Sequence, residues 1–193
     1  MKIGLFGGAF NPFHNGHMAV AKAAIESKMI DKLIFIPSGK APHKKEGTVS
    51  REDRLKMLEL ATENEPQMEI SDYEFKRDTI SYSADTVEYF KSIYPNDELF
   101  FLIGDDSYNQ LDTWYEPHRI IKACTLLVFP REGAEVKPPA VEIPMEKVRI
   151  SSSEIREKIK NGKDCLNLLP KCVFDYIIEK NLYLTGDNCF DRK

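Results

Sequence analysis

The chain alternates short apolar runs with segments of helical periodicity, and this alternation is the feature that most restricts its fold. Apolar runs occur at residues 2–6, 33–36, 99–103 and 125–129. Runs this short, separated by helical segments, are typical of buried parallel strands joined by crossover helices. We therefore expect an α/β fold with a doubly wound parallel sheet covered by helices on both faces.

The segments between the apolar runs carry apolar residues at helical spacing. We expect helices over residues 16–29, 50–62 and 83–94. Ser50 and Asp53 have the spacing of a capping box at the start of the second of these helices.

The C-terminal part changes in character. Residues 151–160 and 170–180 are expected to form consecutive helices, and the proline-containing segment 133–144 is expected to be a loop leading to them. We interpret these helices as a small C-terminal helical subregion that packs on the edge of the sheet rather than as a separate domain.

Length and charge limit the domain count and the partners. The 193 residues suit one domain, residues 1–193, with the sheet core at 1–132 and the C-terminal helical part at 145–185. The net charge is −4 and basic residues lie among acidic ones, so no nucleic-acid partner is expected. No apolar run approaches the roughly 20 residues of a membrane helix. With irregularly spaced cysteines that read as reduced thiols, a cytoplasmic protein is expected.

The connection after the first apolar run, FGGAFNPFHNGH at residues 6–17, has an unusual composition. Gly7 and Gly8 permit a close approach of the backbone to a ligand. His14 and His17 lie where the next helix begins, and free backbone N–H groups there attract anions. In a doubly wound sheet, ligands bind outside the carboxyl ends of the strands, which is where this connection lies.

Three interpretations of the histidines compete. They are incidental members of a glycine-rich connection, or zinc ligands, or donors to a phosphate. A zinc site needs further ligands, and no cysteine or carboxylate cluster is close in the sequence. A phosphate site needs backbone amides and imidazole N–H groups, both of which this segment offers. The phosphate site is the best fit.

A second segment, ISSSEIR at residues 150–156, has the pattern of a helix start. Ser151 suits the capping position, with Glu154 three residues later, and Arg156 lies about a turn further on where it can reach an anion. Alone, the segment is better explained as a capped helix with a solvated arginine. Two anion-ready helix starts in one chain favour a phosphate site.

The two segments resemble the signatures of the nucleotidylyltransferase superfamily. The string G-G-x-F-x-P-x-H-x-G-H ends in the hallmark H-x-G-H at residues 14–17. ISSSEIR is similar to I-S-S-T-x-I-R, with Ser153 in place of the usual threonine. The resemblance implies a Rossmann-like nucleotidylyltransferase fold and transfer of a nucleotide to a phosphorylated acceptor.

Three further stretches resemble the bacterial nicotinate mononucleotide adenylyltransferases. They are IPSGKAPHKK at 36–45, with Ala41 where a proline is usual, SYSADTVEY at 81–89 and IGDDSYNQLDTWYEP at 103–117. The resemblance implies transfer of AMP from ATP to nicotinate mononucleotide in NAD biosynthesis, giving deamido-NAD and pyrophosphate. The displacement would be direct and in line, without a covalent intermediate.

The resemblance also implies the residues of the site. His17, His14 and Arg156 are expected to be catalytic. ATP is expected to contact Gly7, Gly8, Phe10, His14, His17, Gly104, Asp106, Ser151, Ser152, Ser153 and Arg156. The nicotinate nucleotide is expected to contact Ala9, Phe10, His43, Lys44, Ser83, Thr86, Trp114 and Tyr115.

Acceptor selection would depend on a few of these residues. The resemblance implies that Trp114 stacks on the nicotinate ring and that the backbone N–H groups of Thr86 and Tyr115 hold its carboxylate. Taken alone, Trp114 also suits core filling, the GDD sequence suits a turn and the loop around His43 suits solvent. Mg²⁺ is expected on the pyrophosphate leaving group, held by phosphate and water without dedicated protein ligands. The oligomeric state is left open.

Three other functions compete with this one. A related enzyme of the superfamily would use another acceptor, such as phosphopantetheine or glycerol phosphate. A nucleotide-binding sensor without activity would be expected to lack His14, His17 or Arg156, and all three are present. A metal-dependent hydrolase would hold zinc on the histidines, which a metal analysis of the purified protein would detect.

Overall fold

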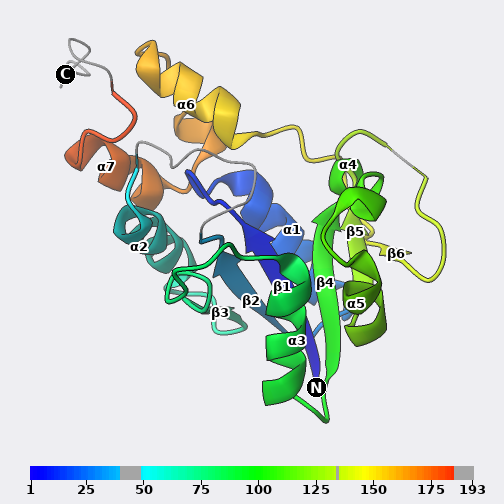
Figure 1. Ribbon diagram of the computed structural model, residues 1–193. Coiled ribbons are helices and arrows are strands. Elements are labelled where there is room, and N and C mark those ends of the chain that lie inside the picture. Colours follow the sequence, from blue (N-terminus) through cyan, green and yellow to red (C-terminus); the bar gives the residue numbers. More distant parts are fainter. Residues whose placement is uncertain (40–48, 134, 185–193) are drawn as a thin grey trace.

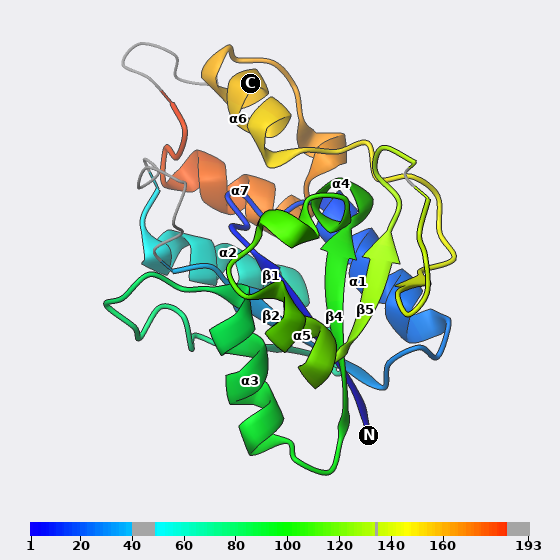
Figure 2. The same ribbon diagram turned by 45° about the vertical axis from the view of Figure 1, so that its right-hand side comes forward.

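The computed structural model describes residues 1–39, 49–133 and 135–184. These residues form a parallel sheet with helices packed on both faces (Figures 1 and 2). In the described ranges, no helix is long and apolar enough to cross a membrane. The expected contacts at His43 and Lys44 lie outside the described residues.

The sheet has six strands in the order β3-β2-β1-β4-β5-β6, and every neighbouring pair is parallel. The prediction of a doubly wound parallel sheet is confirmed. Its strands are β1 (Lys2–Gly8), β2 (Lys32–Pro37), β3 (Met68–Ile70), β4 (Glu98–Gly104), β5 (Thr125–Phe129) and β6 (Val141–Glu142).

The two outermost strands were not predicted. The segment 133–144, expected to be a loop, contains β6, whose Val141 pairs with Leu127 of β5. Beyond it, the Ile143 N–H donates to the Val128 carbonyl at 2.8 Å. The expectation of a loop was wrong at these residues because a strand this short has no detectable periodicity.

The predicted helices are present, most of them a few residues shorter than expected. The helices are α1 (Asn15–Glu26), α2 (Arg51–Thr62), α3 (Ser83–Ile93), α4 (Asp105–Tyr108), α5 (Pro117–Ala123), α6 (Ser152–Lys160) and α7 (Lys171–Glu179). Short 3₁₀ turns cover Leu111–Thr113 and Leu166–Leu168. The predicted caps are confirmed, since Ser50 accepts from the Asp53 amide at 3.0 Å and Ser151 accepts from the Glu154 amide at 3.2 Å. Helices α4 and α5 were not predicted.

The alternation of side chains along the strands divides the core into two layers. On one face, Ile3 and Leu5 of β1 pack under α3 and α5. On the other face, Phe6 of β1 packs with α1 and α2. Successive strand residues point to opposite faces, so both layers can be fully apolar. Figure 1 shows α3 and α5 in front of the sheet and α1 behind it.

The C-terminal helices pack on a helix rather than on the edge of the sheet. Ile155 and Ile159 of α6 and Val173 and Ile177 of α7 form a third apolar cluster with Met57 of α2. This corrects the expected packing on the sheet edge. The physical reason is that α2 has a second apolar side, which would face water without α6 and α7.

Gly4 in the centre of β1 is required by packing, and this generates a stability prediction. A Cβ at this position would lie 2.6 Å from Ile30 Cδ1 and 3.0 Å from Leu33 Cδ1. Gly4→Ala should therefore overpack the core and lower the free energy of unfolding by about 1–3 kcal/mol. Gly7→Ala is the matched control in the same strand, because the nearest atom to its Cβ would be 3.8 Å away. Urea denaturation of both variants should show a loss for the first alone, and equal stabilities would contradict the packing argument.

Candidate active site

The candidate site lies at the carboxyl ends of β1 and β4. These two strands are neighbours in the centre of the sheet, and the chain moves outward from them in opposite directions. This is the topological switch point, where open α/β sheets bind ligands. The H-x-G-H segment follows β1 and the GDD sequence follows β4, so both predicted nucleotide contacts meet at this point.

His14 and His17 exchange hydrogen bonds at the start of α1. The His14 amide donates to His17 Nδ1 at 3.2 Å, and the His17 amide donates to His14 Nδ1 at 3.4 Å. This is a capping box built from imidazoles, and it explains the spacing of three residues. Because each Nδ1 accepts, each neutral ring carries its proton on Nε2.

The two rings stack, with centroids 3.6 Å apart and an interplanar angle of 17°. His17 also lies among the rings of Phe6, Phe10 and Phe13 at centroid distances of 4.9 to 6.0 Å. Burial lowers the pKa of His14 to about 4, and it lowers the pKa of His17 well below its usual value. At neutral pH both imidazoles are uncharged hydrogen-bond donors.

The second signature, at the start of α6, contacts the first. Ser152 Oγ donates to the Pro12 carbonyl at 3.0 Å. The guanidinium of Arg156 donates to the Asn11 carbonyl at 2.8 Å and to Ser153 Oγ at 3.1 Å. Two helix starts that lie far apart in the sequence are thereby joined through their backbone and side chains.

The loop between β1 and α1 is held by two side chains from elsewhere in the chain, Arg54 and Tyr183, and the second of them binds Asn11 of the loop. The sequence analysis gave none of these three residues a role. Tyr183 donates its hydroxyl proton to the Asn11 side chain. Arg54, which is buried, donates to the carbonyls of Ala9 at 2.9 Å and Ser38 at 3.0 Å. Sequence spacing does not reveal these contacts of Asn11, Arg54 and Tyr183, because the partners come from distant parts of the chain.

The side chain of Phe10 belongs to the core. It is 1% exposed and packs against Phe13 and Phe35. Its backbone is in the left-handed region, with φ 45°. Because the ring is buried, the expected ligand contact of Phe10 stays a prediction for its backbone. Gly7 is exposed at the end of β1.

The residues after β4 have two different tasks. The carboxylate of Asp105, 1% exposed, accepts from the amides of Arg131, Glu132 and Gly133 at 2.6 to 3.1 Å, which fixes the loop after β5. Asp106 accepts from the Arg131 guanidinium at 3.0 Å through one oxygen. Among the described residues its other oxygen, Oδ1, is buried and has no partner.

This unpartnered oxygen suits a ligand donor. A buried acceptor without a partner is rare and unfavourable, so a hydroxyl placed here would be bound strongly. Gly104 leaves room for this carboxylate oxygen, because a Cβ there would lie 2.4 Å from Asp106 Oδ1. The sequence analysis predicted that Asp106 contacts ATP. It did not predict that Asp105 holds the loop after β5.

Four of the predicted acceptor residues, Ser83, Thr86, Trp114 and Tyr115, lie at the start of α3 and ahead of α5, whereas Ala9 and Phe10 follow β1. The rings of Tyr82 and Tyr115 lie 4.3 Å apart, next to Ser83 in the first turn of α3. Trp114 is half-buried and meets Phe101 edge to face. The Thr86 amide, expected to hold a carboxylate, donates here to the Tyr82 carbonyl at 3.1 Å.

An arginine joins the two sides of this acceptor region. Arg119 donates to Asp85 at 3.0 Å and to Glu88 at 2.9 Å on α3, and it also pairs with Glu116. Glu116 directly follows Trp114 and Tyr115 in the chain. The ion pairs therefore tie the segment carrying both rings to α3, a link that sequence spacing did not reveal.

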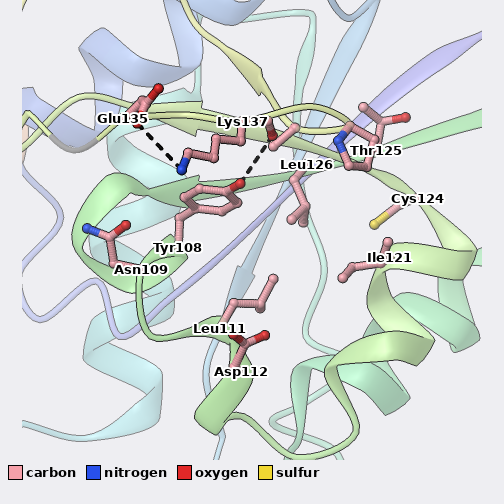
Figure 3. A pocket seen from close by; sticks show the side chains of 12 residues that line it. Tyr108, Asn109, Leu111, Asp112, Ile121, Cys124, Thr125, Leu126, Glu135 and Lys137 are labelled. Carbon is pink, nitrogen blue, oxygen red and sulfur yellow. Dashed lines mark hydrogen bonds and ion pairs between the residues drawn. The ribbon is translucent and has the colours of Figure 1, made fainter.

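A cavity of about 600 Å³ lies outside this site (Figure 3). It is bordered by Tyr108, Cys124, Leu126 and Lys137, and none of the predicted site residues lines it. The carboxyl ends of β1 and β4 remain the candidate site. Over the described ranges, no group of three or more His, Cys, Asp or Glu side chains is placed to hold a metal.

The lowered pKa of His14 predicts a pH dependence of stability. The unfolded histidine titrates near 6.5 and the folded one near 4, so the unfolded state binds more protons between these values. Stability should be highest above about pH 6.5 and decrease as the pH falls toward 4. From about pH 7 to about pH 5 the His14 contribution is about 2 kcal/mol.

His14→Asn tests this, since asparagine is also a favoured N-cap. In urea denaturation, the variant should lose about 2 kcal/mol less than the wild type between the two pH values. Parallel pH profiles would contradict the buried, neutral state of His14.

Comparisons with known proteins agree with this geometry. A family model described as cytidylyltransferase-like matches residues 5–158. A probable nicotinate-nucleotide adenylyltransferase from Carboxydothermus hydrogenoformans is 37% identical over 196 residues, which cover 94% of this chain and 98% of that protein. One from Shouchella clausii is 40% identical over 190 residues, which cover 97% and 98%.

A solved structure shares the fold. The Plasmodium falciparum nicotinic acid mononucleotide adenylyltransferase complexed with NaAD has a TM-score of 0.82 at 20% identity, covering 94% of this chain and 97% of that one. The chain belongs to the cytidylyltransferase-like family, among full-length relatives that carry the name nicotinate-nucleotide adenylyltransferase.

Proposed function

We propose that the chain transfers AMP from ATP to nicotinate mononucleotide, forming deamido-NAD and pyrophosphate. The observation that carries this proposal is the imidazole capping box at the start of α1, joined to the start of α6 through Asn11 and Pro12. It puts two neutral N–H donors and an arginine at one end of the sheet. The full-length relatives supply the acceptor.

The histidines act as donors rather than as acids or bases. His17 donates from Nε2 to the α-phosphate as negative charge moves toward the bridging oxygen, and His14 orients the triphosphate. The acceptor phosphate needs no general base, because its second pKa is around 6 and it is largely ionised at neutral pH. Rate enhancement comes from in-line positioning and charge stabilisation.

The β- and γ-phosphates are assigned to the start of α6. Arg156 uses two of its N–H groups in hydrogen bonds to the Asn11 carbonyl and to Ser153 Oγ. A guanidinium has five N–H groups, so it retains donors for phosphate. The N–H groups of Ser152 and Ser153 in the first turn of the helix add backbone donors there, and Ser151 caps that turn.

The nucleoside end of ATP is assigned to the carboxyl ends of β1 and β4. The unpartnered Asp106 oxygen accepts from a ribose hydroxyl beside Gly104. Gly7 and Gly8 allow the backbone to approach the nucleotide. Mg²⁺ arrives with the triphosphate, and phosphate oxygens and water serve as its ligands.

The acceptor is assigned to the region between α3 and α5. Trp114 offers its ring to the pyridine, with Tyr115 and Ser83 beside it. Backbone amides hold the carboxylate. Because the Thr86 amide makes the first intrahelical bond of α3, the amides before it in the first turn are the free donors.

The first test compares the two pyridine nucleotides. Pyrophosphate release with ATP and Mg²⁺ should be faster with nicotinate mononucleotide than with nicotinamide mononucleotide. We expect a ratio of about 10 to 150 in kcat/KM, which corresponds to the free energy of one hydrogen bond to a charged group. Comparable rates would retain the enzyme class but contradict the amide-donor pocket. No release with either would redirect the search to other phosphorylated acceptors.

The second test removes the main donor. His17→Gln keeps a side chain suited to the capping box but removes the imidazole N–H. We expect kcat to fall by about 10²-fold or more with a smaller change in the KM for ATP, because the lost bond forms mainly in the transition state. His118→Gln, at an exposed position of α5, is the control and should keep wild-type rates. Full activity of His17→Gln would contradict the assigned role.

A further inference from the structure

A buried carboxylate outside the assigned chemistry links two segments of the acceptor region. Glu74 lies in the turn between β3 and α3 and is 7% exposed. Glutamate is almost never buried unless its charge is compensated. The sequence analysis gave this residue no role, and the adenylyl transfer described above does not use it.

Each oxygen of the Glu74 carboxylate accepts from a different segment. The Thr86 hydroxyl donates to Oε1 at 2.8 Å, and the Gly39 amide donates to Oε2 at 3.1 Å. Thr86 is itself buried, 3% exposed. The backbones also meet closely, because a Cβ at Gly39 would lie 2.4 Å from the Glu74 carbonyl oxygen.

The ionised carboxylate accepts from both donors. A glutamine at this position could still accept from the Gly39 amide and donate its NH₂ group to the Thr86 oxygen, because a hydroxyl both donates and accepts. Burial raises the pKa of Glu74, whereas the donors Thr86 and Gly39 and the nearby Arg77 favour the ionised form. Breaking one such bond leaves a buried polar atom without a partner.

Both partners of Glu74 belong to the acceptor side. Gly39 follows β2 and is the last described residue before the segment that carries His43 and Lys44. Thr86 lies in the first turn of α3, together with Ser83. Among the described residues, neither partner makes a hydrogen bond to the start of α1 or α6, which the proposed function assigns to ATP.

We propose that Glu74 is a positioning residue for the acceptor nucleotide: its carboxylate holds the Gly39 backbone against the first turn of α3 and so sets the geometry of the acceptor pocket. This inference rests on the proposed function. Glu74 acts through Gly39 and Thr86 and not on the substrate, because both of its oxygens are already engaged.

The test separates the KM for the acceptor from the other kinetic constants. Glu74→Ala and Thr86→Val each remove the bond between the two side chains. Each should raise the KM for nicotinate mononucleotide about tenfold or more. This factor corresponds to the free energy of a hydrogen bond to a charged group. The KM for ATP and kcat should change by less than about threefold.

Thr62→Val is the matched control. Thr62 is a buried threonine, 7% exposed, whose hydroxyl donates to the Leu58 carbonyl within α2. The same substitution there should leave all three kinetic constants unchanged. The double variant Glu74→Ala/Thr86→Val should raise the acceptor KM no more than the larger single effect, since both changes remove the same bond.

The outcomes distinguish this inference from the proposed function. A wild-type chain that forms no dinucleotide would overturn the proposed function and this inference with it. An active wild type with unchanged acceptor KM in Thr86→Val would overturn the inference alone, even if Glu74→Ala does not fold. Equal increases in the KM values for ATP and acceptor would also overturn it, because they indicate a general loss of structure.

Discussion

The exchange of hydrogen bonds between His14 and His17 is the interaction on which the site depends. It caps α1 and sets the protonated nitrogen of both rings. Burial among phenylalanine rings then keeps the imidazoles neutral. One local arrangement therefore provides the helix start, the tautomers and the donors that phosphoryl chemistry needs.

The rest of the structure holds this arrangement in place from a distance. Arg156 of α6 and Tyr183 near the end of α7 both bind Asn11, and Arg54 of α2 binds the Ala9 carbonyl. The C-terminal helices are thus part of the site. Their apolar cluster with α2 supplies the stability that lets them position these polar side chains.

Buried carboxylates have an organising role in two parts of the candidate site. Asp105 accepts from three backbone amides of the loop after β5, next to the proposed nucleoside position. Glu74 accepts from an amide and a hydroxyl on the proposed acceptor side. In each case one ionised group satisfies several donors and fixes a segment that has no regular secondary structure. Such links hold loops more rigidly than apolar contacts would, because hydrogen bonds are directional.

The sequence by itself determined the parallel sheet, the capped starts of α2 and α6, and the segment holding the histidines, because each depends on neighbours within a few residues. It did not reveal β6, whose two residues lack periodicity, or the packing of the C-terminal helices on α2. It did not show that the Phe10 ring lies in the core. Only the tertiary structure decided that Glu74 meets Thr86 and that Arg156 meets Asn11. Contacts between side chains far apart in the sequence depend on how the helices cross the sheet, and local spacing does not encode that geometry.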